Sequence, residues 1–160
     1  MKAAVCREWG RIEIEEIDEP SPRAGEVKLR LEATGLCGTD RSILEGHLRP
    51  PLPIVLGHEG AGTVVEVGPG VSSLVPGDRV VCTIVVSCDR CYFCVRGEPG
   101  LCETNRLLTG TMLDGTTRLS RGGEPIHSLS YQASFAEFAV VPECPAVKLP
   151  PDTPQAEVAG

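Results

Sequence analysis

Alternating apolar and polar residues divide much of the chain into short segments. Residues 12–17 alternate isoleucines with glutamates, and residues 27–31 alternate Val or Leu with charged side chains. A period of two is that of a strand with one face buried, so we expect half-buried strands in both places. Further strand candidates have similar apolar runs, and they are residues 63–67, 79–86, 135–141 and 146–149.

Glycine- and proline-containing turns separate these segments, for example at residues 19–25, 68–70 and 76–78. Only residues 40–45 and 91–96 have a helical pattern, and both stretches are short. Many short strands at regular spacing favour a closed or nearly closed all-β barrel. The pattern therefore predicts a mainly β fold with short helices.

Two stretches do not fit the strand pattern. Residues 103–133 form a polar, glycine-containing excursion that is too long for an ordinary connection, so we expect a functional or packed loop. The proline-rich tail at residues 150–154 indicates a linker or the edge of a domain.

Composition narrows the class of protein. A chain of 160 residues with 41% hydrophobic and 23% charged residues is typical of about one globular domain. Its net charge of −7 and its lack of a Lys/Arg cluster argue against a nucleic-acid partner. No apolar run approaches the roughly 18 residues of a membrane span, and the N-terminus does not resemble a signal peptide. We therefore expect a cytoplasmic protein with no membrane partner.

Four of the eight cysteines are clustered, at positions 88, 91, 94 and 102. Two-residue gaps bring successive sulfurs around one centre, and four thiolates form a closed site of the kind that holds structural zinc. An iron–sulfur cluster is an alternative, although the spacing before the fourth cysteine differs from the ferredoxin pattern. A redox pair or disulfides are further alternatives, and the absence of a signal peptide weakens the second.

A second group of possible ligands lies earlier in the chain. Cys37 follows a glycine, and His58 sits between Gly57 and a glutamate, twenty-one residues further on. Glycine permits the tight backbone that a metal site needs, and Asp40 could orient the imidazole of His58. Spacing alone leaves open the alternative of a buried free cysteine and an unrelated loop histidine.

Several motifs in order make the chain resemble the zinc-dependent medium-chain alcohol dehydrogenases. They are CGTD at residues 37–40, GHEGAG at 57–62, PGDRV at 76–80, SFAEF at 134–138 and the four-cysteine spacing. Residues 110–118 and 125–127 resemble the branch with a long loop, which includes primary-alcohol and glutathione-dependent formaldehyde dehydrogenases. The resemblance covers essentially the whole chain.

The resemblance implies a domain organisation and a reaction. Residues 1–150 would be a GroES-like catalytic domain, which is a mainly β, partly open barrel with short helices and a structural zinc lobe at 88–102. Residues 151–160 would begin the connection to a Rossmann domain. The complete protein would oxidise an alcohol to an aldehyde or ketone with NAD or NADP, and we expect it to be a homo-oligomer. The isolated chain would be inactive, because it has no GxGxxG fingerprint and the family's third ligand of the catalytic zinc follows later.

The resemblance also assigns roles to single residues around that zinc. Cys37 and His58 would be ligands, and Asp40 would hold His58 in place. Thr39 would relay the proton of the alcohol, with a cap on the helix at 40–45 as its alternative role. Glu59 would approach the metal and ease ligand exchange, or would instead be an ion-paired carboxylate beside it.

Other positions are less clearly assigned. Leu48 and Ile84 fall where the family lines its substrate pocket, and the alternative for both is ordinary barrel core. Gly38 and Ser42 depart from the family's pattern, so an arginine contact to the cofactor and a histidine at the end of the relay are not expected. The remaining cysteines are predicted to be apolar packing residues, at positions 6, 82 and 144.

A different class of function remains open on the residues alone. The chain could be a stand-alone zinc-binding β-barrel module without enzymatic activity, or an iron–sulfur or redox protein. Metal analysis separates these, because iron or a visible absorption band would exclude zinc.

Overall fold

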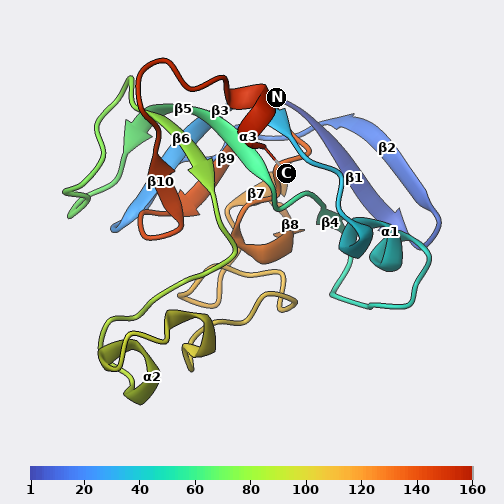
Figure 1. Ribbon diagram of the computed structural model, residues 1–160. Helices are drawn as coiled ribbons and strands as arrows, with labels where there is room; N and C mark the ends of the chain where they lie inside the picture. Colours follow the sequence, from blue (N-terminus) through green and yellow to red (C-terminus); the bar gives the residue numbers. More distant parts are fainter. Residues whose placement is uncertain (160) are drawn as a thin grey trace.

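The computed structural model describes residues 1–159, which form two curled five-stranded sheets and a lobe that projects from them (Figure 1). The first sheet has the strand order β2-β1-β4-β8-β7. Its strands are β1 (Lys2–Glu8), β2 (Arg11–Glu16), β4 (Ile54–Val55), β7 (Leu119–Arg121) and β8 (Glu124–Ser128). The second sheet has the order β10-β6-β5-β3-β9. Its strands are β3 (Glu26–Thr34), β5 (Gly60–Val67), β6 (Arg79–Cys82), β9 (Phe138–Pro142) and β10 (Ala146–Lys148).

Strand β3 is the centre of the second sheet, paired antiparallel with β5 on one side and β9 on the other. Val27 and Leu29 are fully buried, as their alternation predicts. Lys28 on the other face is also buried, where its ammonium pairs with Glu19 at 2.5 Å and lies 5.1 Å from the ring of Phe138. Strand β3 is thus covered on both edges, up to the point where the chain leaves the sheet after Thr34.

The two sheets meet along one seam. A bridge joins Ala3 to Ala136, and the amide of Ala4 donates to the carbonyl of Phe135 at 2.8 Å. The amide of Leu31 donates to Glu137 at 3.0 Å, so the chain between the sheets is bonded to both. The prediction of a mainly β, partly open barrel with short helices is confirmed.

All helices are short. They are α1 (Gly38–Leu44), α2 (Tyr92–Val95), α3 (Gln155–Val158) and the 3₁₀ turns η1 (Pro99–Leu101) and η2 (Leu129–Tyr131). Helices α1 and α2 lie where the pattern predicts them. Helix α3 lies just beyond the tail predicted to be a linker, and it packs on β3, β5 and β6.

Two strand predictions need correction. Strand β6 ends at Cys82 and does not reach residue 86, because the hydroxyl of Thr83 accepts the amide of Val85 at 2.9 Å and turns the chain out of the sheet. Strand β2 is an edge strand and not half-buried, since Ile14 is 70% exposed. Ile12 on the same face still packs against the core, so alternation found the strand and its inward face but overestimated the burial of Ile14.

The excursion at residues 103–133 is packed and contains strands. Strands β7 and β8 form a hairpin, and β8 pairs parallel with β4, so the excursion completes the first sheet. Arg118 attaches the excursion to β3, because its guanidinium donates two hydrogen bonds to the buried carboxylate of Glu26, at 2.7 and 2.6 Å. The same guanidinium also pairs with Asp114 at 2.8 Å.

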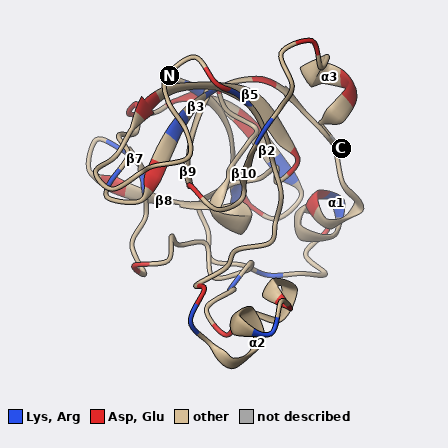
Figure 2. Cartoon of the chain, turned by 60° about the vertical axis from the view of Figure 1, so that its left-hand side comes forward, with Lys and Arg blue, Asp and Glu red and all other residues tan. Residues whose placement is uncertain are grey.

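Acidic and basic positions are interspersed over the molecule (Figure 2). Many of them are paired, as in the contact of Arg7 with Glu15 at 2.7 Å. Among residues 1–159 no helix is long and apolar enough to cross a membrane.

Candidate metal centres

The projecting lobe gathers the four clustered cysteines at positions 88, 91, 94 and 102. Their sulfurs all lie within 4.8 Å of one another, and Cys88 and Cys94 are 4.0 Å apart. Tetrahedral zinc with Zn–S bonds of about 2.3 Å requires sulfurs roughly 3.8 Å apart. The donor set and its spacing therefore fit zinc. The eight cysteines are free thiols, so the disulfide alternative is not realised in this structure.

Hydroxyl groups support two of these sulfurs. Ser87 Oγ donates to Cys94 Sγ at 3.3 Å, and Thr104 Oγ1 lies 3.1 Å from Cys102 Sγ. Burial by itself raises the pKa of the Cys102 thiol, but hydrogen bonds from Thr104, followed by those from Cys88 and Cys94, together outweigh it and lower that pKa to about 6. The thiolate that a metal needs is thus favoured at this position.

The second cluster is assembled by strand pairing. Thr34 at the end of β3 lies opposite Gly60 at the start of β5, so the segments beyond them leave the sheet at the same end. Cys37 follows on one segment, and His58 and Glu59 precede β5 on the other. Ligand atoms of these three residues lie within 4.8 Å of one another. The predicted ligands Cys37 and His58 are thereby brought together, with Glu59 beside them.

Asp40 connects the two segments that carry the ligands of this cluster. Its carboxylate accepts the amide of Cys37 at 3.1 Å and the amide of Gly57 at 2.9 Å. Its Oδ1 also lies 3.5 Å from Nδ1 of His58, and Asp40 is 2% exposed. The predicted contact with the imidazole is thus present, and the same side chain also completes the capping box of α1.

The electrostatics favour charged partners in this cluster. The Asp40 carboxylate raises the pKa of His58 to about 9. Hydrogen bonds from Thr39 lower the pKa of the Cys37 thiol. His58 Nδ1 is buried and makes no well-aligned hydrogen bond within the described residues. Because Nδ1 faces Asp40, a metal would bind the other ring nitrogen, Nε2, in place of a proton, beside the sulfur of Cys37 and the carboxylate of Glu59.

The other predicted site residues lie around this cluster or on the surface. Thr39 Oγ1 is 3.6 Å from Cys37 Sγ. Thr39 does not cap the helix, because α1 begins at Gly38 with Cys37 as its N-cap. Leu48 is 36% and Ile84 39% exposed, so the alternative of barrel core is wrong for both.

The leftover cysteines differ from one another. Cys6 and Cys82 are buried as predicted, and burial raises the pKa of Cys82 to about 12. Cys144 is exposed, so its predicted packing role is wrong. It sits in the turn between β9 and β10, outside both strands.

Sequence reasoning missed two buried polar residues that precede β9 and contact the segments carrying the candidate metal ligands. Gln132 and Ser134 are each 2% exposed, and Ser134 Oγ is 2.7 Å from Thr34 Oγ1. Neither belongs to a periodic pattern, and the only available signal was the SFAEF motif that begins at Ser134.

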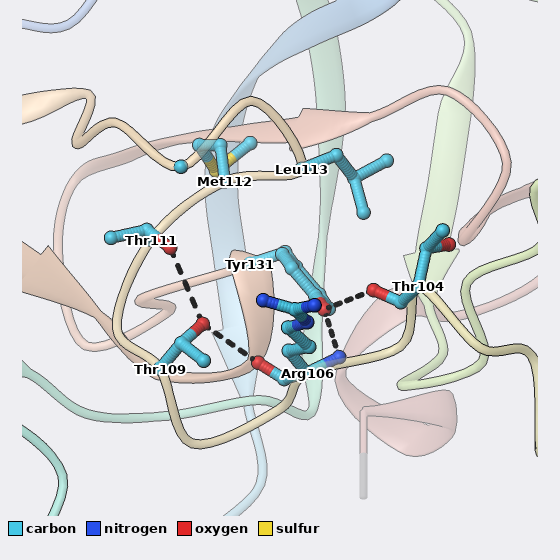
Figure 3. A pocket seen from close by; sticks show the side chains of 8 residues that line it. Thr104, Arg106, Thr109, Thr111, Met112, Leu113 and Tyr131 are labelled. Carbon is cyan, nitrogen blue, oxygen red and sulfur yellow. Dashed lines mark hydrogen bonds between the residues drawn. The ribbon is translucent and has the colours of Figure 1, made fainter.

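A cavity of about 230 Å³ lies between Tyr131 and the segment that follows the four-cysteine lobe (Figure 3). Its lining is Thr104, Arg106, Thr109, Thr111, Met112, Leu113, Gly115 and Tyr131.

Residues 23–151 match the family described as the alcohol dehydrogenase GroES-like domain. The chain belongs to this family. An NDMA-dependent alcohol dehydrogenase from Amycolatopsis methanolica is 41% identical over 150 residues, which are 92% of this chain and 40% of that protein. An S-(hydroxymethyl)glutathione dehydrogenase from Escherichia coli O1:K1 is 43% identical over 155 residues, 94% of this chain and 42% of that protein.

Solved structures agree with this assignment. An alcohol dehydrogenase zinc-binding domain protein from Burkholderia ambifaria superposes with a TM-score of 0.90 at 42% identity, over 96% of this chain and 43% of that one. Benzyl alcohol dehydrogenase from Acinetobacter calcoaceticus gives a TM-score of 0.85 at 34% identity, over 96% and 42%. The chain thus spans about two fifths of the length of these relatives.

Proposed function

We propose that this chain is the catalytic domain of a zinc-dependent alcohol dehydrogenase that oxidises an alcohol with NAD or NADP. The observation that carries the proposal is the cluster of Cys37, His58 and Glu59, with Asp40 bonded behind it. The four-cysteine lobe, which fits structural zinc, accompanies it as a second metal centre. The family match and the alcohol dehydrogenases among the relatives support the same reaction class.

The proposed domain organisation follows from the length of the relatives. Residues 1–150 would be the GroES-like domain, with the lobe at 88–102, and residues 151–160 would lead into a nucleotide-binding Rossmann domain. The relatives are more than twice as long as this chain, which leaves room for such a domain. We also propose that the complete protein is a homo-oligomer.

Zinc held by Cys37 and His58 would supply Lewis acidity toward the oxygen of the alcohol. The side chains of this domain would position the ligands, move the proton and assist ligand exchange. Asp40 would fix the ring of His58 through the contact at 3.5 Å. Thr39, whose hydroxyl lies 3.6 Å from Cys37 Sγ, would accept the proton of the alcohol and pass it on. Glu59 would assist the exchange of groups at the metal.

Leu48 and Ile84 would form apolar walls for a small aliphatic or aromatic alcohol. Both are partly exposed in this domain and therefore free to contact a substrate. A benzyl alcohol dehydrogenase among the similar structures is consistent with such a substrate class.

The test uses the whole protein. We expect two zinc ions per chain and alcohol-dependent reduction of NAD or NADP. Thr39→Ala should lower kcat by about 10²-fold or more with little change in KM, because the proton transfer loses its positioned hydroxyl. Thr39→Ser should restore most of the rate. Thr63→Ala, which removes a hydroxyl bonded to Glu32 on the outside of β5, is the matched control and should have no effect.

The alternative of a stand-alone zinc-binding module gives a different result. Such a protein would hold one zinc in the four-cysteine lobe and reduce no nicotinamide cofactor with any alcohol. A solvent isotope effect on kcat that is unchanged by Thr39→Ala would reject the relay. Bound iron would reject both zinc assignments.

A further inference from the structure

Residues 130–134, here called the brace, are strained and buried. Ser130, Tyr131 and Ala133 have φ values of 51°, 64° and 55°, in the left-handed region that non-glycine residues avoid. None of residues 130–134 is more than 5% exposed. Strain of this kind persists only where the surrounding structure fixes it, and it is concentrated at functional sites.

One end of the brace is bonded to both sides of the ligand segment of His58 and Glu59. The amide of Ser134 donates to the carbonyl of Gly57 at 3.0 Å, on the N-terminal side. The side-chain oxygen of Gln132 accepts the amide of Gly60 at 3.3 Å, on the C-terminal side. The two ligands therefore lie between two backbone positions that the brace holds.

The brace also contacts the segment that carries Cys37. Ser134 Oγ lies 2.7 Å from the hydroxyl of Thr34, the last residue of β3. The side-chain Nε2 of Gln132 donates to the carbonyl of Thr83 at 3.1 Å, just beyond β6. The side chain of Gln132 thus uses its acceptor on β5 and a donor on the loop after β6 at once, which neither leucine nor glutamate could do.

The other end of the brace is bonded to the four-cysteine lobe. The hydroxyl of Tyr131 accepts the amide of Arg106 and donates to the carbonyl of Thr104 at 3.4 Å (Figure 3). Thr104 in turn contacts Cys102 through its own hydroxyl at 3.1 Å. Hydrogen bonds, together with the covalent link from Tyr131 to Gln132, therefore connect Cys102 to Gly60, two residues after His58.

We propose that the brace positions the His58–Glu59 segment against Cys37, and that Tyr131 couples this positioning to the four-cysteine lobe. Gln132 and Ser134 are positioning residues, since they touch the backbone beside the ligands and not the ligands themselves. When the four-cysteine lobe holds its metal, residues 102–106 are held in place. These residues then hold Tyr131, and the strained backbone between them holds Gln132. The inference rests on the proposed metal chemistry of the two clusters.

The first experiment titrates the metal-free whole protein with Co²⁺ and records its visible absorption. Subtracting the spectrum of Cys37→Ser assigns the bands of the second cluster. We expect Gln132→Leu to weaken cobalt binding there by 10–100-fold and to shift its bands, as loss of a supporting hydrogen bond does. Ser134→Ala should weaken it in the same direction. The bands of the four-cysteine cluster should keep their position in both variants.

Gln155→Leu is the matched control for lost packing and stability. Gln155 is also buried and also makes two hydrogen bonds, to the carbonyl of Gly62 at 2.6 Å and from Arg79 at 3.0 Å. It lies in α3 and bonds to the same strand β5, but it does not flank the ligands, so its loss should leave cobalt binding unchanged. Equal cobalt affinities in Gln132→Leu and Gln155→Leu would overturn the positioning role.

The second experiment measures the coupling with a double-mutant cycle. Cys91→Ser disrupts the lobe, and we expect it to lower cobalt affinity at the second cluster by about fivefold or more in the wild-type background. In the Tyr131→Phe background the same change should have less than a twofold effect. If Cys91→Ser does not fold, Tyr131→Phe alone, with the lobe intact, should still lower cobalt affinity at the second cluster.

The outcomes separate this inference from the proposed function. Cobalt binding at Cys37 without alcohol-dependent reduction of the cofactor would overturn the proposed function and leave the brace standing. Wild-type cobalt spectra without bands that depend on Cys37 would overturn both. If Cys91→Ser lowers cobalt affinity at the second cluster equally in the wild-type and Tyr131→Phe backgrounds, the coupling is overturned.

Discussion

Gly57 offers the sharpest test of how the ligand segment is packed. Its φ is +86°, and a Cβ there would lie 2.5 Å from both Phe135 Cδ1 and Ser134 Oγ. A non-glycine residue in this conformation costs about 1–2 kcal/mol, and overpacking a filled site typically adds about 1–3 kcal/mol. We therefore expect Gly57→Ala to lower the free energy of unfolding by about 2–5 kcal/mol.

Gly70 is the matched control, because its φ is +84° and no atom lies within 4 Å of a Cβ placed there. Gly70→Ala should cost only the conformational part, about 1–2 kcal/mol. Urea unfolding of the zinc-loaded protein measures both. With a slope of about 2 kcal/mol per molar urea, an added 2 kcal/mol lowers the midpoint of Gly57→Ala by about 1 M relative to Gly70→Ala. Equal midpoints for the two variants would refute the packing argument.

Three further outcomes are expected. Arg118→Met should lower the free energy of unfolding by about 3–5 kcal/mol, because it leaves the buried carboxylate of Glu26 without its ion-pair partner. In denaturant unfolding, the double variant with Glu26→Gln should lose less stability than the sum of the two single changes. Arg7 lowers the pKa of Glu15 below its ordinary 4.5, so this pair stabilises the fold above that pH and the effect is lost as pH falls through the lower folded-state pKa. Arg7→Gln should make the acid loss of thermal stability shallower, and an unchanged pH profile would contradict this. Cys144→Ser should leave the zinc content of the lobe unchanged in metal analysis, because Cys144 is not among the four clustered thiols; a loss of one zinc would show otherwise.

Local signals explain what the sequence could predict. The four cysteines at 88–102 lie within fifteen residues, so short gaps alone bring their sulfurs together. Period-two alternation located β3 because its inward positions, Val27 and Leu29, are apolar and fully buried. The resemblance supplied the rest of the prediction, including the meeting of Cys37 with His58.

Non-local pairing explains what the residues alone could not show. Cys37 and His58 meet because Thr34 is paired with Gly60, a register that no single segment encodes. Strand β4 has two residues and carries no period, yet its parallel pairing with β8 places the long excursion in the first sheet. The role of Gln132 depends on two backbone groups, of Gly60 and Thr83, which lie far from it in sequence.

The exposed edge strand β2 bears on how copies of this protein behave in crowded solution. Its outer edge has no partner strand among residues 1–159, and an open edge with an exposed isoleucine invites pairing with another molecule. An antiparallel partner copy centred on Ile14 would place Glu13 opposite Glu15 of the other molecule. Like charges directly opposite are unfavourable. The same glutamates that mark the strand in the sequence thus discourage it from seeding aggregates.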